Sequence, residues 1–130
     1  MLSKEFFRFA LAGAAGFIVD AGILHLCQPA LGYYGGRALS FACAVFTTWL
    51  INRSLTFRNK HSGLSLWQEF LRYVSLMLAG GAVNYGCYVV LTLVSATVRE
   101  FPVLGVAAGS IAGMLGNYLS VKFLLFKHQE

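Results

Sequence analysis

Four basic side chains occupy matching places in the two halves of the sequence, where they could hold anionic groups. Arg8 and Arg72 precede long apolar stretches, whereas Arg53 and Lys122 follow such stretches. Cations at these places attract anionic lipid headgroups. They could also be plain interface anchors, because Lys and Arg at helix ends reach toward water and favour helix C-termini. Both interpretations stay open, although separate anchors need no such matching.

Four of the polar side chains within or at the ends of the apolar stretches could form a path through a membrane. Asp20 lies 12 residues after Arg8, which is about 18 Å deeper along a helix. A charge at that depth costs about 2.5–3.5 kcal/mol, so Asp20 should face the bundle interior or a wet cavity, or be protonated. Asn84 matches Asp20 without its charge, and Asn52 and Asn117 could bond between helices. A purely structural hydrogen bond is the alternative for each.

Small residues predict one close helix contact. The spacing Gly105-x-x-x-Gly109-x-x-x-Gly113 makes a smooth face that another helix can approach closely. The spacing leaves open whether the partner helix lies in the same chain or in a second subunit. Within the chain, the stretch that contains Ala12 and Gly16 is the expected partner, because these two residues have the same spacing.

The elements that carry these residues are four apolar segments in a chain of 130 residues, the size of one domain (1–130). Hydrophobic residues make up 58% and charged residues 12%, against about 45–50% and 25% in soluble domains, and the mean hydropathy is +0.68. Lipid requires internally satisfied backbone groups, so the segments should be helices. We therefore expect an all-α integral membrane protein with uncleaved spanning helices at about 7–27, 34–57, 70–97 and 101–126.

The two halves of the chain resemble each other. Residues 6–26 align with 70–90 at an offset of 64, so that Gly16 meets Gly80, and the following helices align at an offset of 69. The repeat units are 6–57 and 70–126. Because each unit holds two helices, both should enter the membrane in the same direction, as parallel repeats.

The distribution of Lys and Arg predicts the orientation. Of the 10 such residues only Arg37 and Arg99 fall in the two outer loops, so both termini and the middle loop should be cytoplasmic (N-in/C-in). The formal charge of +5 then reflects orientation and attraction to anionic membrane lipids, and nucleic-acid binding is not needed to explain it.

Catalytic and metal-binding patterns are not evident. The sequence has no paired-carboxylate motif, no nucleophile with a base at useful spacing and no phosphate-cradling glycine loop after a strand. Cys27, Cys43 and Cys87 show no metal or redox spacing. We expect a protein that is not an enzyme and holds neither a metal nor a cofactor.

Short motifs over nearly the whole chain resemble those of the GtrA-like family, small four-helix membrane proteins linked to bactoprenol-linked glucose translocation. The family pattern is Arg-Phe before a glycine-rich helix with a central Asp, then Asn-Arg followed by Thr-Phe. The corresponding residues here are Arg8-Phe9, Gly13, Gly16, Asp20, Asn52-Arg53 and Thr56-Phe57, with a weaker echo at Asn117-Tyr118, Lys122 and Phe126. Two departures are Thr48, where the family often has Asn, and Val121-Lys122 in place of a second Asn-Arg pair.

The resemblance implies translocation or presentation of a polyprenyl-phosphate-linked sugar for glycosylation of a cell-envelope polysaccharide. The setting would be the bacterial cytoplasmic membrane, beside a membrane glycosyltransferase. Arg8, Arg53, Arg72 and Lys122 would bind the lipid phosphate, since Arg recognises phosphate bidentately and Lys as a point charge. Asp20, Asn84, Asn52 and Asn117 would hydrate the path of the sugar.

Two other functions fit parts of the pattern. A non-transporting accessory subunit of a glycosyltransferase would use the glycine face for docking. A small multidrug/proton antiporter would use Asp20, but the strong charge bias argues against the dual topology of such proteins. Four helices enclose little space, which is compatible with a homodimer.

Overall fold

The structure is a computed structural model that describes residues 2–129. Within these residues four helices are long and apolar enough to cross a membrane. Their ranges are Lys4–Gly32, Tyr34–Thr56, Leu66–Val94 and Pro102–Leu125. The prediction of an all-α membrane protein with four spanning helices is confirmed.

Large apolar side chains cover the outward surfaces of the helices. Phe17, Ile18 and Leu93 keep 72%, 70% and 73% of their surface exposed. In water such a continuous apolar exterior would drive association. In a bilayer the same side chains face lipid, which explains why so little of each span is buried within the protein.

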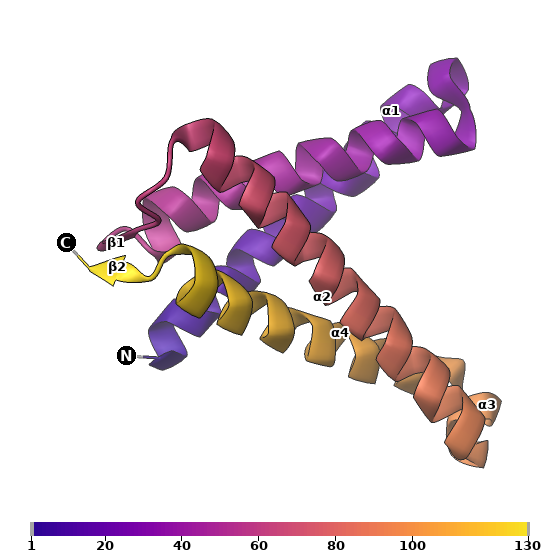
Figure 1. Cartoon of the computed structure of the whole chain (residues 1–130). Coiled ribbons are helices and arrows are strands. Elements are labelled where there is room, and N and C mark those ends of the chain that lie inside the picture. Colours follow the sequence, from indigo (N-terminus) through magenta and orange to yellow (C-terminus); the bar gives the residue numbers. More distant parts are fainter. Residues whose placement is uncertain (1, 130) are drawn as a thin grey trace. The chain divides into compact units, whose positions relative to one another are not determined.

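The described chain forms two compact units. The first runs to Phe70 and includes the C-terminal residues from His128, and the second is Leu71–Lys127. Helix α1 (Leu2–Ile51) belongs to the first unit and is broken at Gly32, where φ is 78°. Only glycine adopts this left-handed conformation readily. The chain reverses there, and the two halves of α1 run back alongside each other (Figure 1).

The reversal point corrects one expectation. The predicted helices 7–27 and 34–57 place Pro29 in the loop between them, but it lies inside α1, and the turn comes three residues later at Gly32. A proline inside a spanning helix is tolerated where neighbouring groups satisfy the freed backbone.

The two halves of α1 approach closely at a glycine. A Cβ on Gly16 would collide with the side chain of Thr48 and lie 3.4 Å from the carbonyl oxygen of Ala44. Near the chain's start, the Phe9 and Phe57 rings meet edge to face with centroids 6.4 Å apart. These contacts hold the two spans of the first unit together.

The end of α1 passes into a π-helical turn, Asn52–Thr56, and then into the short strand β1 (Lys60–His61). β1 pairs antiparallel with β2 (His128–Gln129), with Lys60 opposite Gln129 and His61 opposite His128. The Lys60 ammonium lies 3.1 Å from the Glu5 carboxylate. The start of α1, the middle loop and the C-terminal strand therefore gather at one end of the first unit. The pairing of the two strands was not predicted from the sequence.

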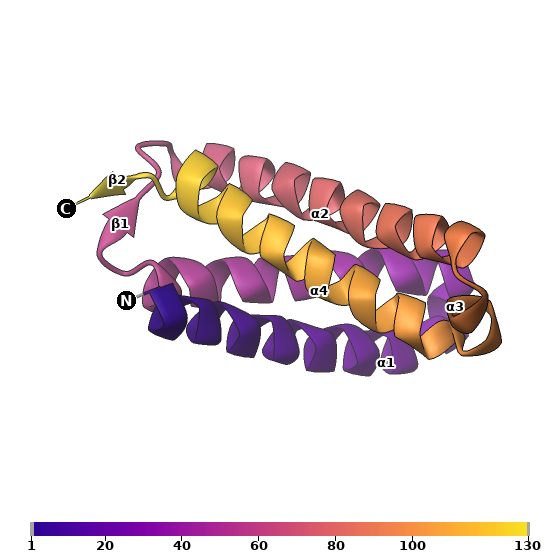
Figure 2. The ribbon, with the colours of Figure 1, turned by 90° about the horizontal axis from the view of Figure 1, so that it is seen from below.

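The second unit contains most of α2 (Leu66–Val94), the short helix α3 (Ala96–Glu100) and α4 (Pro102–Ser120), which continues as a π-helical turn at Val121–Leu125. Ser95 caps α3, because its hydroxyl accepts a hydrogen bond from the Val98 amide. Pro102 stands at the start of α4, where its missing N–H costs nothing. α2 and α4 lie side by side in both views (Figure 2).

The glycine face of α4 packs against α2. The spacing alone had suggested the helix that contains Ala12 and Gly16 as its partner within the chain. Cβ atoms on Gly105, Gly109 and Gly113 would lie 2.9 Å from the Tyr88 ring, 2.5 Å from the Asn84 carbonyl oxygen and 3.0 Å from the Gly80 carbonyl oxygen. Spacing reveals that a face is smooth, but the partner depends on which helix the chain brings beside it.

The two units carry the same local features at the offsets found in the sequence. Gly16 lies under Thr48 in the first unit, and Gly80 lies under Asn117 in the second. The π-helical turns at Asn52–Thr56 and Val121–Leu125 are also 69 residues apart. The membrane direction of the two repeats stays a prediction.

Substitution of Gly109 should separate α2 from α4. Gly109→Leu would press a side chain against the Asn84 backbone, and overpacking of this kind costs about 1–3 kcal/mol. Gly116→Leu is the matched control on the same helix, because a Cβ there meets nothing within 4 Å. The free energy of unfolding in mixed micelles should fall for Gly109→Leu alone. An equal fall for both variants would contradict the packing described.

Candidate functional site

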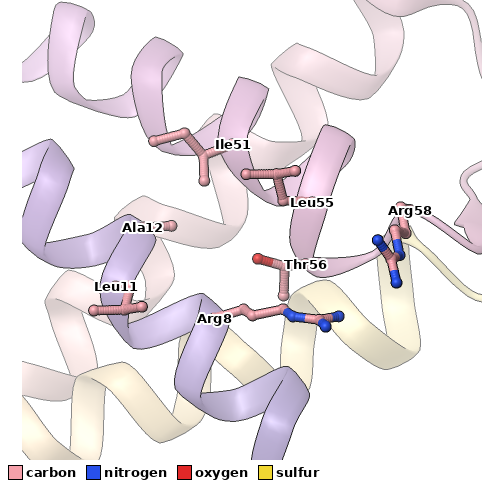
Figure 3. A pocket seen from close by; sticks show the side chains of 7 residues that line it. All are labelled: Arg8, Leu11, Ala12, Ile51, Leu55, Thr56 and Arg58. Carbon is pink, nitrogen blue, oxygen red and sulfur yellow. The ribbon is translucent and has the colours of Figure 1, made fainter.

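A cavity of about 240 Å³ lies in the first unit, between the first half of α1 and the segment that runs from the end of α1 through the π-helical turn to Arg58. It is lined by Arg8, Leu11, Ala12, Ile51, Leu55, Thr56 and Arg58. Figure 3 shows the guanidinium groups of Arg8 and Arg58 toward one end, with Leu11, Ala12 and Ile51 toward the other. The cavity thus offers positive charge at one end and a hydrocarbon surface at the other.

Helical spacing accounts for the lining. Leu11 and Ala12 follow Arg8 by three and four residues and so share its face of the helix. From the facing side, Ile51 is the last residue of α1, and Leu55 and Thr56 follow in the π-helical turn.

The π-helical turn then ends the span and brings Arg58 to the same cavity. The amide of Phe57 donates to the carbonyl oxygen of Asn52 at 2.8 Å, and the hydroxyl of Thr56 donates to Asn52 Oδ1 at 2.8 Å. Asn52, predicted as a residue of the polar path, is buried within this turn.

Arg8 and Arg58 are exposed, and neither has a hydrogen-bond or ion-pair partner among the side chains that the structure describes. Two like charges at one end of a cavity create a positive potential that attracts an anion. Each guanidinium can bind a phosphate or carboxylate through two parallel N–H donors. The site is therefore suited to an amphiphilic anion.

Arg53 has a different environment. Its Nε and Nη2 donate to the Glu69 carboxylate at 2.7 and 3.2 Å. The indole of Trp49 donates to the same carboxylate at 2.8 Å, and the hydroxyl of Ser62 donates at 2.7 Å. The Glu69 side chain is 1% exposed and that of Arg53 36%. Arg53, predicted as a phosphate ligand, is thus bound within the protein to a buried carboxylate.

The local sequence before α2 places Glu69 in this position. The Ser65 hydroxyl accepts from the Gln68 amide at 3.2 Å, and the Gln68 side chain accepts from the Ser65 amide at 3.3 Å. This reciprocal pair is a capping box that fixes the helix start. Glu69 then lies in the first turn, where the helix dipole favours an anion.

Asp20 is ion-paired with Arg37, which comes from the other half of α1. Nη1 of Arg37 also donates to the buried hydroxyl of Ser40 at 3.2 Å. Paired charges are the usual way in which a carboxylate is accommodated within a spanning segment. Arg37, expected only as an outer-loop cation, is therefore the partner of the predicted path residue Asp20.

The remaining predicted residues belong to the second unit. Arg72 is exposed. Lys122 contacts Tyr118, with its ammonium 3.4 Å from the phenol oxygen and 5.6 Å from the ring centroid. Asn117 lies over Gly80, and within the described residues its buried Oδ1 has no hydrogen-bond partner. Asn84 lies over Gly109, with Oδ1 2.6 Å from where a Cβ would stand.

The sequence analysis singled out neither Arg58 nor the Glu69 network with Trp49 and Ser62. A signal for Glu69 was present, since an acidic residue in an otherwise apolar segment needs a partner. For Arg58 the sequence held no comparable signal, because its place beside Arg8 depends on how α1 folds back.

In the described part of the chain, no group of three or more His, Cys, Asp or Glu side chains lies close enough together to bind a metal ion. The three cysteines are free and partly buried. The geometry supports binding and positioning of an anion.

The helices and their charged ends define a multi-pass membrane protein. The family model of the GtrA/DPMS transmembrane domain matches residues 8–126. The chain belongs to this family, whose members are mainly non-catalytic membrane proteins associated with glycosyl-lipid carrier translocation or glycosylation. No curated protein matches the chain. The GtrA-like resemblance inferred from the sequence is confirmed.

Proposed function

We propose that the protein binds the phosphate of a polyprenyl-phosphate-linked sugar between Arg8 and Arg58 and moves this lipid across the bacterial cytoplasmic membrane. The sugar would then serve glycosylation of a cell-envelope polysaccharide. The observation that carries the proposal is the cavity of the first unit, in which two arginines without partners among residues 2–129 adjoin an apolar lining.

The shape of the site supports a lipid phosphate over a soluble one. A soluble anion would make no apolar contact with Leu11, Ile51 and Leu55, whereas the first isoprene units of a polyprenyl phosphate would cover such side chains. The phosphate would meet the guanidinium groups at the charged end of the cavity.

The charge distribution supports docking at the cytoplasmic leaflet. Most Lys and Arg residues flank the termini and the middle loop, and such residues favour the cytoplasmic side. Arg72 and Lys122 of the second unit would add further attraction for lipid headgroups at that leaflet. A membrane glycosyltransferase is the proposed partner that supplies or uses the lipid.

A reconstitution experiment tests the proposal. Purified protein in vesicles should accelerate the movement of labelled polyprenyl-phosphate glucose between leaflets, measured as the fraction that an impermeant oxidant of sugars reaches from outside. Protein-free vesicles and a labelled phosphatidylcholine of similar chain length are the controls. Binding without any acceleration would favour the accessory role, and absence of binding would refute both.

The antiporter alternative receives no support from the site. Its proton-carrying group would be Asp20, and that carboxylate is ion-paired with Arg37.

A further inference from the structure

A second cavity, of about 330 Å³, lies between α2 and α4 in the second unit. Gly81, Asn84, Tyr85 and Tyr88 line it from α2, and Val106 and Ser110 line it from α4. We propose that this groove is a saccharide subsite, which holds the neutral sugar of the glycosyl lipid while it is inside the membrane. This inference rests on the proposed function and extends it to the residues that line the groove. Of these residues, the sequence analysis singled out only Asn84.

The groove lies at membrane depth. Gly81 is 15 residues from Leu66, the first residue of the 29-residue helix α2, which places it about 22 Å along a helix of about 43 Å. The groove therefore opens near the middle of a span, where lipid chains offer no hydrogen bonds.

Four hydrogen-bonding side chains line this lipid-depth groove. Within residues 2–129, no partner is found for the side chains of Asn84, Tyr85, Tyr88 or Ser110. Tyr85 is 69% exposed. Unpaired polar groups in an apolar medium are costly, so their presence on an open groove indicates a ligand that supplies the missing hydrogen bonds.

The chemistry of the lining selects a sugar over a phosphate or a hydrocarbon chain. None of the six lining residues is charged, in contrast to the cavity that contains Arg8 and Arg58. Tyrosine rings provide a flat apolar surface for the C–H face of a pyranose, and the phenols, the amide and the hydroxyl can bond its ring hydroxyls. Pockets with aromatic walls and a few polar groups are typical of small-molecule sites.

A glycine keeps the groove open and supplies the test. A Cβ on Gly81 would meet nothing within 4 Å, so Gly81→Phe fills the groove. Gly86 on the same helix also has open space around its Cβ but does not line the groove, so Gly86→Phe is the matched control. Both variants exchange a helical glycine for the same residue.

Binding is measured in nanodiscs with two probes, polyprenyl phosphate and polyprenyl-phosphate glucose. The native protein should prefer the sugar-bearing lipid by about tenfold, the effect of one or two neutral hydrogen bonds. Gly81→Phe should abolish the preference without weakening binding of bare polyprenyl phosphate, and Gly86→Phe should keep it. Should Gly81→Phe not fold, Tyr85→Phe combined with Ser110→Ala removes only hydroxyl groups and should reduce the preference about fivefold.

The outcomes separate this inference from the proposed function. If the native protein binds neither lipid, both fail. If it binds both equally, or if groove variants keep the preference, the subsite is refuted and the phosphate site stands. If Gly81→Phe weakens the binding of both lipids equally, the saccharide subsite is refuted and the groove binds the isoprenoid chain. If it changes only the oligomeric state in light scattering, the occupant is a second copy of the chain.

Discussion

Arg53→Gln is expected to destabilise the protein by about 3–5 kcal/mol, because it leaves the Glu69 carboxylate buried without its cationic partner. Glu69→Gln should cost less, about 1–3 kcal/mol, since it leaves a guanidinium that is 36% exposed and can be solvated. The asymmetry follows from the different burial of the two partners. Unfolding free energies in mixed micelles measure it.

The double variant Arg53→Gln/Glu69→Gln is the critical comparison. It removes both charges together, so its cost should be smaller than the sum of the two single costs. Arg72→Gln and Glu100→Gln, which change exposed residues, control for the loss of a charge alone. If the single costs add, or if Glu69→Gln is the more harmful change, the buried ion pair is not the cause.

This pair changes what a loss of function at Arg53 would mean. If Arg53 were a phosphate ligand, as the family resemblance implies, its removal should abolish glycosylation and leave protein levels intact. With Glu69 bound to its Nε and Nη2, the same change should lower the amount of folded protein as well. Function assays of Arg53 variants therefore need a measure of folded protein beside them.

The fold was largely predictable because membrane spans are encoded by the length of apolar runs. Each of the four apolar spans between Lys4 and Leu125 is long enough to cross the hydrocarbon core. The length of an apolar span can be read from the local sequence without knowledge of distant contacts. The reversal at Gly32 was not predictable in the same way, since Pro29 is the stronger breaker by composition. The β1–β2 pair joins residues 60–61 to 128–129, a separation that no local pattern reveals.

The site was predictable only in part, because charge type and position do not identify a partner. Arg53 and Arg58 are both basic residues near the end of one span. A capping box 12 residues beyond Arg53 places Glu69 against it, whereas the turn after Thr56 leaves Arg58 beside Arg8. The repeat suggested Arg53 and Lys122 as equivalent ligands, yet Lys122 contacts Tyr118 and Arg53 contacts Glu69.

Simultaneous replacement of Arg8 and Arg58 should have the largest effect on ligand binding. Arg8→Gln/Arg58→Gln removes both cations of the cavity, and binding of polyprenyl phosphate in nanodiscs should fall about 100-fold, because each charge-assisted pair contributes about tenfold at a partly solvated site. Arg8→Lys/Arg58→Lys should recover part of the loss, since it restores charge without bidentate geometry. Stability should change little, because neither arginine is paired with a described side chain.

The matched control is Lys4→Gln/Lys127→Gln, which removes the same net charge from two exposed residues outside the cavity. General attraction to an anionic bilayer amounts to about fivefold per cation, so both double variants should bind phosphatidylglycerol vesicles more weakly and to a similar degree. Only the arginine variant should lose additional affinity for polyprenyl phosphate, measured in neutral nanodiscs. Equal losses of polyprenyl phosphate affinity for both double variants would contradict a specific site in the cavity. The phosphate would then be attracted only by the summed positive charge of the protein surface at the membrane.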